Sequence, residues 1–404
     1  MRVLLAHNYY GSSAPSGENQ VFDAEGKLLR QRGHEVSECL RHSDAIRSKG
    51  AWGALQGALS TPWNPFAAAA IKRAVAARQP DVVHVHNTFP LLSPAIFHAI
   101  GHRAARVLTL HNYRLFCPAA IPMRAGRVCI DCLDRRSVLP ALQHGCYRGS
   151  RLATLPLVAN VALHRFLGTW TKQVDAFIAL TGFQRERMIE AGLHAELVHV
   201  KPNFYPGNPA IVPWADRRPS VVFAGRLTAE KGVVALVRAW LMWGASAPEL
   251  RIVGDGDLRG ELERLAATAP EVSIRFLGQL GGDAAQSEIA RARLLVLPSE
   301  WFEGFPMVVR EAFALGTPVA VSNIGPLPSI VRHGENGVVF APGDPQSLLA
   351  TVRTAWEKTG ELERLAAGAR KSFEALYTEE ANYRVLMAIY AQAMEVSQRR
   401  GGAA

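Results

Sequence analysis

The chain has 404 residues, 49% of them apolar, a length that exceeds what one hydrophobic core usually organises and therefore predicts two domains. The apolar stretch at residues 2–6 is too short for a signal peptide, and no apolar run reaches the about 20 residues that span a bilayer, so we expect a cytoplasmic protein. The net charge is +10, but the basic residues are scattered and form no helix-turn-helix, zinc-finger or aromatic ribonucleoprotein pattern, which disfavours nucleic acid as a partner.

Short apolar runs alternate with longer helical patterns, the rhythm of a mostly parallel sheet covered by helices. In the first half we predict a helix at residues 20–33 and strands at 3–6, 82–86, 107–110 and 177–180. In the second half we predict strands at 220–224, 250–253, 274–277, 294–297 and 318–321. Five prolines between residues 201 and 219 exclude a helix or a central strand and indicate a linker. The fold class is therefore α/β, with two doubly wound domains.

Ligands of such sheets bind beyond the carboxyl ends of the strands, which directs attention to the residues that follow each run. Gly17 lies in the loop after the first strand, where a glycine lets the backbone approach a phosphate. His111 directly follows the strand at 107–110 and could hydrogen-bond a substrate hydroxyl or carbonyl. His84 and His86 are interpreted instead as packing residues at a strand end.

Four of the five cysteines fall in an irregular insertion at residues 114–150, namely Cys117, Cys129, Cys132 and Cys146. Four thiols with one Cys-x-x-Cys pair suit tetrahedral zinc, which could fold a loop that has no core of its own. Unligated thiols, a disulfide or an iron–sulfur cluster are the alternatives.

The positive charge is concentrated in the first half, because residues 1–210 hold 24 Lys and Arg against 13 Asp and Glu, whereas residues 211–404 hold 21 against 22. Such asymmetry indicates an anionic partner for the first domain. Residues 148–172 mix basic and large apolar side chains, as in an interfacial helix, although a core helix is equally consistent. We hypothesise that this segment docks the first half on anionic lipid.

Two turns in the second half carry charged or glycine residues just after predicted strands. In residues 223–232, Arg226 and Lys231 could converge on one pyrophosphate, although either alone is an ordinary solvated charge. In residues 251–265, Gly254 marks a tight strand-to-helix turn that lines a nucleotide pocket. The glycine spacing is too loose for a dinucleotide fingerprint, which disfavours NAD.

The strongest pattern is residues 298–319, which follow the strand at 294–297. We predict that Pro306 takes the first position of a helix, so that Gly304 and Phe305 lie at its N-terminus, where free amides and the helix dipole bind anions. The structural alternative is an ordinary helix cap. Glu303 and Glu311 flank this helix start, eight positions apart.

These stretches together resemble glycosyltransferase family 4. The matching segments run through nearly the whole chain: Gly17 with Glu18, RGHEV at 32–36, DVVHVHN at 81–87, LHNY at 110–113, FIALTGFQRERMIEAGL at 177–193, KPNF at 201–204, GRLTAEKG at 225–232, GDG at 254–256, and the two glutamates. The resemblance implies the GT-B fold, in which two Rossmann-like domains face a central cleft. It implies an N-terminal acceptor-side domain at 1–203, a C-terminal nucleotide-sugar domain at 204–375, and a final segment at 376–404 whose helix returns to the first domain. From composition we expect the short tail at Arg399–Ala404 to be disordered.

The resemblance also assigns roles to single residues. It implies that Gly17 lies by the donor phosphates, that His111 contacts the transferred sugar, and that Arg226 and Lys231 hold the pyrophosphate. Glu303 with Gly304 and Phe305 would hold the donor sugar and phosphate, and Glu311 the ribose. The remaining donor-binding residues implied are Asn203, Gly225, Gly254 and Pro306.

The implied reaction transfers a hexose from a UDP- or GDP-sugar to a glycan or lipid-linked acceptor with retained configuration and no catalytic metal. Two alternatives stay open: a sugar-nucleotide epimerase, and a nucleotide-sugar-binding protein without turnover. A glycoside hydrolase is disfavoured, because eight helical residues advance ~12 Å, whereas hydrolase carboxylates lie about 5–9.5 Å apart.

Overall fold

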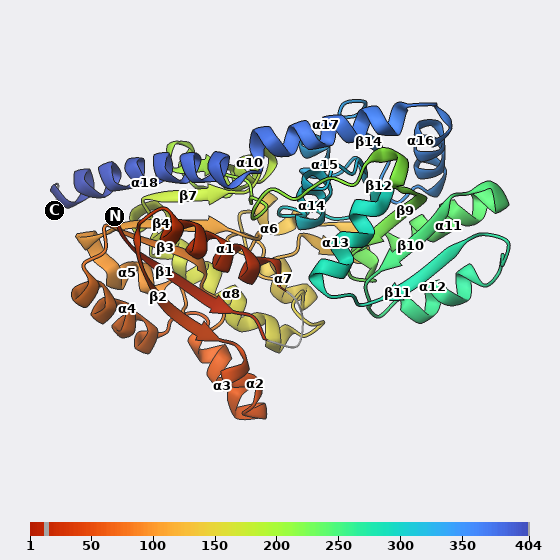
Figure 1. Cartoon of the computed structure of the whole chain (residues 1–404). Helices are drawn as coiled ribbons and strands as arrows, with labels where there is room; N and C mark the ends of the chain where they lie inside the picture. The colour runs from red at the N-terminus through yellow and green to blue at the C-terminus, as the bar shows by residue number, and fades with distance from the viewer. Residues whose placement is uncertain (12–15, 403–404) are drawn as a thin grey trace. The chain divides into compact units, whose positions relative to one another are not determined.

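The computed structural model describes residues 1–11 and 16–402, which form two compact units (Figure 1). The first unit comprises Met1–Pro122, Ile130–Pro202 and Asn382–Ala404, and the second comprises Met123–Cys129 and Asn203–Ala381. Each unit is built on its own six-stranded sheet whose strands pair in parallel. The predicted α/β class, with two doubly wound domains, is confirmed.

The first sheet has the strand order β2-β1-β3-β4-β7-β8. Its strands are β1 (Arg2–Tyr9), β2 (Glu35–His42), β3 (Val82–Asn87), β4 (Ala105–Leu110), β7 (Ala176–Ala179) and β8 (Val198–Val200). The four predicted strands of this half correspond to β1, β3, β4 and β7, which are buried almost throughout because helices cover both faces of a parallel sheet. The two strands that were not predicted, β2 and β8, lie at the edges.

Side-chain caps start several helices of the first unit. Ser16 accepts from the amide of Asn19 at the start of α1, and Asn64 accepts from two amides at the start of α4. The helices are α1 (Gly17–Gln31), α2 (Asp44–Arg47), α3 (Gly50–Ser60), α4 (Pro65–Arg78), α5 (Ala95–Ile100), α8 (Arg151–Phe166), α9 (Thr169–Lys172) and α10 (Gly182–Glu190).

The insertion at residues 114–150 contains short elements. These are the antiparallel pair β5 (Met123–Arg124) and β6 (Arg127–Val128), and the helices α6 (Asp131–Asp134) and α7 (Leu139–His144). Cys132 and Cys146 join an apolar cluster with Val158 and Val161 of α8. Side chains of α8 thus supply part of the apolar core of the insertion.

The second sheet has the order β11-β10-β9-β12-β13-β14. Its strands are β9 (Arg218–Ala224), β10 (Glu249–Val253), β11 (Ile274–Gly278), β12 (Ala292–Leu297), β13 (Val319–Ser322) and β14 (Gly337–Phe340). The helices are α11 (Val233–Trp243), α12 (Arg259–Ala266), α13 (Gly282–Arg291), α14 (Met307–Ala314), α15 (Leu327–Ile330), α16 (Pro345–Glu357) and α17 (Glu361–Leu376). These helices and the sheet pack together around an apolar core. Within it, Trp240 of α11 is fully buried, and its indole N–H donates to the carbonyl of Pro248.

The final helix, α18 (Glu379–Gly402), runs along the first unit's sheet (Figure 1). Leu386, Ile389, Tyr390 and Ala393 belong to the same core cluster as Val3 and alternate buried residues of β1, β4 and β7. The expected disordered tail from Arg399 is wrong up to Gly402, because the helix continues to that residue; positions 403–404 lie outside the described residues. Within the described part of the chain, no helix is both long and apolar enough to cross a bilayer.

Candidate functional site

Two glycines bring the loops at one edge of the second sheet into close contact. Gly254 follows β10 with φ +132°, and a Cβ atom there would lie 1.9 Å from the carbonyl oxygen of Gly225, which follows β9. Gly232 has φ +66°, and its Cβ would lie 1.9 Å from the carbonyl oxygen of Pro298, which follows β12. Only glycine fits both positions. The turns after β9, β10 and β12 therefore form one interlocked edge.

Lys231 and Glu303 meet at this edge. The Nζ atom of Lys231 lies 2.7 Å from Oε1 of Glu303, and the hydroxyl of Ser299 donates to the same oxygen at 2.7 Å. Trp301 places its ring 5.5 Å from the ammonium, within the range of a cation–π contact. Residues separated by 72 positions thus form one charged group, which the sequence predicted only as a shared role.

Arg226 does not join that group. Its guanidinium is mostly exposed and pairs with Glu230, four residues further along the chain, at 3.1 Å. The convergence of Arg226 and Lys231 on one pyrophosphate stays a prediction.

Helix α14 begins beside Lys231 and Glu303. Pro306 is its N-cap in an extended conformation and Met307 is its first residue, so the prediction that Pro306 takes the first helical position is wrong by one residue. Gly304 and Phe305 precede the cap by two residues and one residue, and whether their amides bind an anion stays a prediction. Asn203 donates from Nδ2 to the sulfur of Met307 at 3.6 Å, which places this linker residue at the helix start.

Glu311 lies within α14, one residue after Arg310. Burial raises the pKa of its carboxyl, and the neighbouring guanidinium of Arg310 opposes the shift. A carboxyl that has lost part of its hydration is a good acceptor for hydroxyl groups, which fits the ribose role that the family resemblance implies for Glu311.

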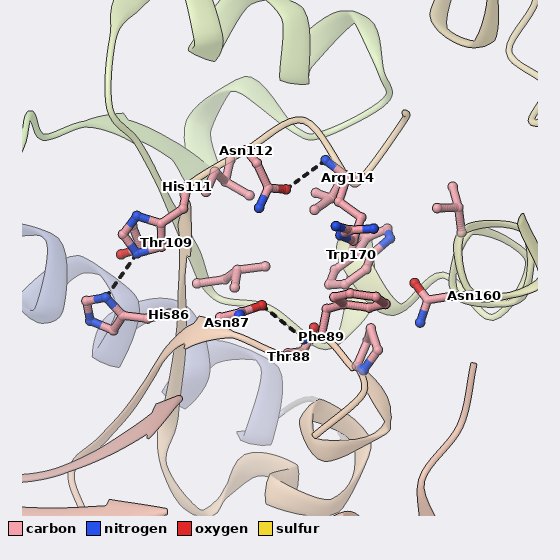
Figure 2. A pocket seen from close by; sticks show the side chains of 15 residues that line it. His86, Asn87, Thr88, Phe89, Thr109, His111, Asn112, Arg114, Asn160 and Trp170 are labelled. Carbon is pink, nitrogen blue, oxygen red and sulfur yellow. Dashed lines mark hydrogen bonds between the residues drawn. The ribbon is translucent and has the colours of Figure 1, made fainter. Parts of the chain in front are cut away.

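The first unit holds a pocket near the carboxyl ends of β3 and β4 (Figure 2). His111 and His86 line it on one side, with Nδ1 of His86 3.1 Å from Nε2 of His111. Arg114 lines it further along, with its guanidinium carbon 4.1 Å from the ring centre of Phe89. His111 therefore reaches a pocket, as its strand-end position suggested, and His86, which was interpreted as a packing residue, reaches it as well.

Glu18 is a residue that the sequence marked only as a neighbour of Gly17. Gly17 is the first residue of α1, and Glu18 accepts from Nδ2 of Asn112, which lines the pocket. Burial raises the pKa of the Glu18 carboxyl, while Asn112 and Arg114 act in the opposite direction. The pairing with Asn112 spans 94 positions, so no local pattern could have indicated it.

The predicted structural zinc site is not supported. Among the described residues, the group whose potential ligand atoms lie within 4.8 Å of one another is Glu25, His84 and His86, and it contains none of the clustered cysteines. Burial raises the pKa of Cys117 to about 12, and the nearby thiols of Cys132 and Cys146 act in the same direction. Cys132 is the buried member of the four, and its packing in an apolar cluster accounts for its burial.

Two protein-family models match the chain in succession. Residues 16–206 match the model described as Glycosyltransferase Family 4, and residues 207–372 match the model described as Glycosyl transferases group 1. An uncharacterized glycosyltransferase of Methanocaldococcus jannaschii is 33% identical over 186 residues, which cover 46% of this chain and 47% of that protein. A D-inositol 3-phosphate glycosyltransferase of Catenulispora acidiphila is 28% identical over 338 residues, covering 79% and 74%. The chain thus spans about half the length of the first of these relatives.

Solved structures share the fold over nearly the whole chain. Anabaena HepE in complex with UDP has a TM-score of 0.64 at 19% identity, covering 97% of this chain and 100% of that chain. The lipopolysaccharide outer core galactosyltransferase WaaB also has a TM-score of 0.64, at 15% identity, covering 96% and 99%. Both support the GT-B arrangement of two Rossmann-like domains.

Proposed function

The chain belongs to glycosyltransferase family 4 and has the GT-B fold, and from that premise we propose that it transfers a hexose from a UDP- or GDP-sugar to a glycan or lipid-linked acceptor in cell-surface polysaccharide synthesis. The observation that carries the proposal is the group formed by Lys231, Glu303 and the start of α14 at one edge of the second sheet. A cation and helix-end amides suit a diphosphate, and an adjacent carboxylate suits sugar hydroxyls.

In this proposal the bond between the sugar C1 and the diphosphate oxygen breaks, and its electron pair leaves with the nucleoside diphosphate. The acceptor oxygen forms the new bond on the same face and passes its proton to the departing diphosphate oxygen there, so configuration is retained. Lys231 and the amides near Gly304 stabilise the charge that develops on the departing diphosphate, which is the main contribution a protein makes when it offers no nucleophile. Glu303 and Glu311 hold hydroxyls of the sugar and ribose, and His111 contacts the transferred sugar. No catalytic metal is assigned to these steps.

Donor binding is the first test. We expect UDP or GDP, and the corresponding hexose conjugate, to raise the melting temperature of the protein, whereas ADP raises it less. UDP is favoured because HepE, a structural neighbour, was solved with UDP and with UDP-glucose. A ligand at 100 times its Kd stabilises the folded state by about 2.7 kcal/mol, which a thermal-shift assay resolves.

The Lys231→Ala variant is the control for that assay, because it should lose most of the UDP or GDP shift. No shift with any nucleotide would contradict the proposal. Binding without transfer or slow donor hydrolysis, over a panel of acceptors, would favour the binding protein without turnover, and interconversion of sugar nucleotides would favour the epimerase.

An anionic membrane surface is the second partner that we propose. Trp52, Leu55 and Leu59 lie on one side of α3 and are exposed, Trp52 by 78%. The opposite side of α3 carries Gly53 and Gly57, which pack against Ile46. Neighbouring α8, for which an interfacial and a core helix were equally consistent, buries six residues and exposes Leu152, Leu155 and Phe166, the last by 88%. Exposed aromatic and aliphatic side chains on a unit rich in Lys and Arg match a bilayer with anionic headgroups.

We expect the protein to sediment with vesicles that contain phosphatidylglycerol and not with vesicles of phosphatidylcholine alone. The triple variant Trp52→Ser, Leu55→Ser, Leu59→Ser should bind the vesicles at least tenfold more weakly. The reason is that each apolar side chain that enters the bilayer contributes about 1.5–3 kcal/mol when fully buried. The matched control is Leu376→Ser, which removes a half-exposed leucine of the second unit. Equal sedimentation of the triple variant and the wild type would remove α3 from the proposal.

A further inference from the structure

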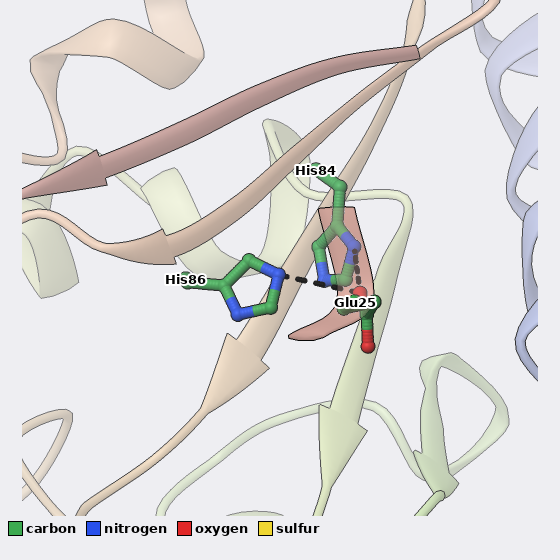
Figure 3. Close-up of side chains that lie close together, drawn as sticks. All are labelled: Glu25, His84 and His86. Carbon is green, nitrogen blue, oxygen red and sulfur yellow. Dashed lines mark ion pairs between the residues drawn. The ribbon is translucent and has the colours of Figure 1, made fainter. Parts of the chain in front are cut away.

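Glu25, His84 and His86 form a buried charged cluster (Figure 3), and His86 also lines the pocket of the first unit. Glu25 of α1 and His84 of β3 are fully buried, and His86 is 2% exposed. The ammonium of Lys201 lies 2.7 Å from Oε2 of Glu25 and also donates to Oδ1 of Asn382. Burial by itself would raise the pKa of Glu25. The ammonium of Lys201, helped by the nearby imidazoles, outweighs burial and holds this pKa well below its usual range.

The second oxygen of that carboxylate faces two imidazoles. Oε1 of Glu25 lies 3.0 Å from Nδ1 of His84 and 3.3 Å from Nε2 of His86. His84 has other partners, since its Nδ1 lies 2.8 Å from the hydroxyl of Tyr390 and its Nε2 lies 2.7 Å from that of Thr109. Neither Oε1 of Glu25 nor Nε2 of His86 has a well-aligned hydrogen bond among the described residues. Oε1 of Glu25 lies between the two rings, and it is the polar atom that faces Nε2 of His86.

The proton positions follow from which groups can only accept. An ionised carboxylate has no proton to give, and a bare imidazole nitrogen at 3.3 Å would repel it, so Nε2 of His86 carries a proton. Burial lowers the pKa of His86 to about 4, so this ring is neutral near pH 7 and its Nδ1 is bare. Nδ1 of His86 must then accept from Nε2 of His111, 3.1 Å away. His111, whose pKa burial also lowers, has its single proton on Nε2 and a bare Nδ1.

We propose that Glu25 is a positioning residue: through His86 it fixes the proton of His111 on Nε2, so that His111 presents a bare Nδ1 that accepts a hydroxyl of the bound sugar. The second part rests on the proposed transferase function. The first part is a property of the folded unit alone, because Glu25, His86 and His111 all belong to it.

The groups that a metal ion would need as ligands at Glu25 and His84 are already engaged with other residues. Glu25, His84 and His86 could geometrically hold a metal ion, but the carboxylate already pairs with Lys201 and Nδ1 of His84 already contacts Tyr390. A metal would add positive charge beside a buried ammonium, which is unfavourable at such distances.

The wild-type protein provides the first test. In protein labelled with ¹⁵N-histidine, long-range ¹H–¹⁵N spectra near pH 7 distinguish a protonated ring nitrogen from a bare one, and the variants His86→Gln and His111→Gln assign the two rings. We expect both rings to be neutral with the proton on Nε2. A proton on Nδ1 of either ring, or a charged His111, would overturn the proposal.

The variant Glu25→Gln makes the relay run in reverse. Lys201 can only donate, so the amide oxygen of Gln must face Lys201 and its NH₂ group must face the histidines. Nε2 of His86 then becomes an acceptor, and the protons of both His86 and His111 move to Nδ1. The double variant Glu25→Gln, Lys201→Met frees the amide to turn round, and the wild-type proton positions should return. Glu196→Gln is the control, since Glu196 is an exposed neighbour of the exposed His194.

Transfer activity separates the two parts of the proposal. We expect kcat to fall at least tenfold in Glu25→Gln with a smaller change in the KM for the donor, and to recover in the double variant. Moved protons with unchanged kcat would refute the contact of His111 with the sugar but keep the relay. Unmoved protons in Glu25→Gln would refute the relay whether or not transfer persists, and an unstable single variant leaves the wild-type spectrum to decide.

Discussion

Replacing Lys231 with alanine is expected to reduce turnover by about 10²–10³-fold, the range seen when one preorganised donor to a developing negative charge is removed. The ammonium lies 2.7 Å from Glu303 at the start of α14, where we place the departing diphosphate. The fold should persist, because Lys231 is at the edge of the sheet and Ser299 still donates to Glu303. Steady-state rates with the preferred nucleotide-sugar, together with the melting temperature, measure both effects.

The control for this prediction is Lys358→Ala, which removes an exposed lysine paired with Glu361 at the start of α17 and should leave the rate unchanged.

Glu311→Ala is expected to lower turnover by orders of magnitude as well, since it removes the carboxylate assigned to the ribose. Wild-type rates in both Lys231→Ala and Glu311→Ala would refute the assignment of the donor site to α14.

Replacing Asp175 with alanine is expected to cost about 3–5 kcal/mol of folding free energy, the usual result of breaking a buried ion pair from one side. Asp175 and Arg106 are fully buried as a pair, and the guanidinium of Arg106 donates to both carboxylate oxygens, at 2.9 and 3.0 Å. Arg400 of α18 also donates to Asp175, at 3.1 Å. The variant would leave the guanidinium of Arg106 without its carboxylate inside the sheet.

Urea denaturation followed by circular dichroism measures this cost, with the first unit's transition as the readout. The control is Glu190→Ala, which breaks a partly exposed pair with Arg187 and should change stability by less than about 1 kcal/mol. A loss in Asp175→Ala as small as that of Glu190→Ala would contradict the role of the buried pair.

The sequence predicted the four central strands of the first sheet and missed its two edge strands. The central strands β3 and β4 are buried throughout, whereas β2 carries Glu35, Ser37 and Glu38 and is half exposed because it lies at an edge. Edge strands carry weaker hydrophobic signals, and β14, at one edge of the second sheet, was missed as well. The other edge strand of that sheet, β11, was predicted although it is only partly buried.

The residues of the proposed donor site follow strands in compact motifs, so Lys231, Gly254 and Glu303 could be selected one motif at a time, and the structure brings Lys231 and Glu303 into contact. What local pattern could not show is which side chains meet. Lys201 pairs with Glu25 across 176 positions, and His84 contacts Tyr390 across 306. Such pairings depend on the topology of the sheet and on α18, neither of which is written in a short window of sequence.

The return of α18 to the first unit has a consequence for biosynthesis. Tyr390 and its apolar neighbours fill the core between the first unit's strands, yet they follow residue 202 only after the whole second unit has been made. At about 5–20 residues per second, those roughly 180 residues take on the order of 10–40 s. During that interval on the ribosome the nascent first unit has an incomplete core, and His84 lacks its contact with the hydroxyl of Tyr390. The first unit therefore completes its core only after the second unit has been synthesised. During this interval its exposed apolar surface is a target for chaperones.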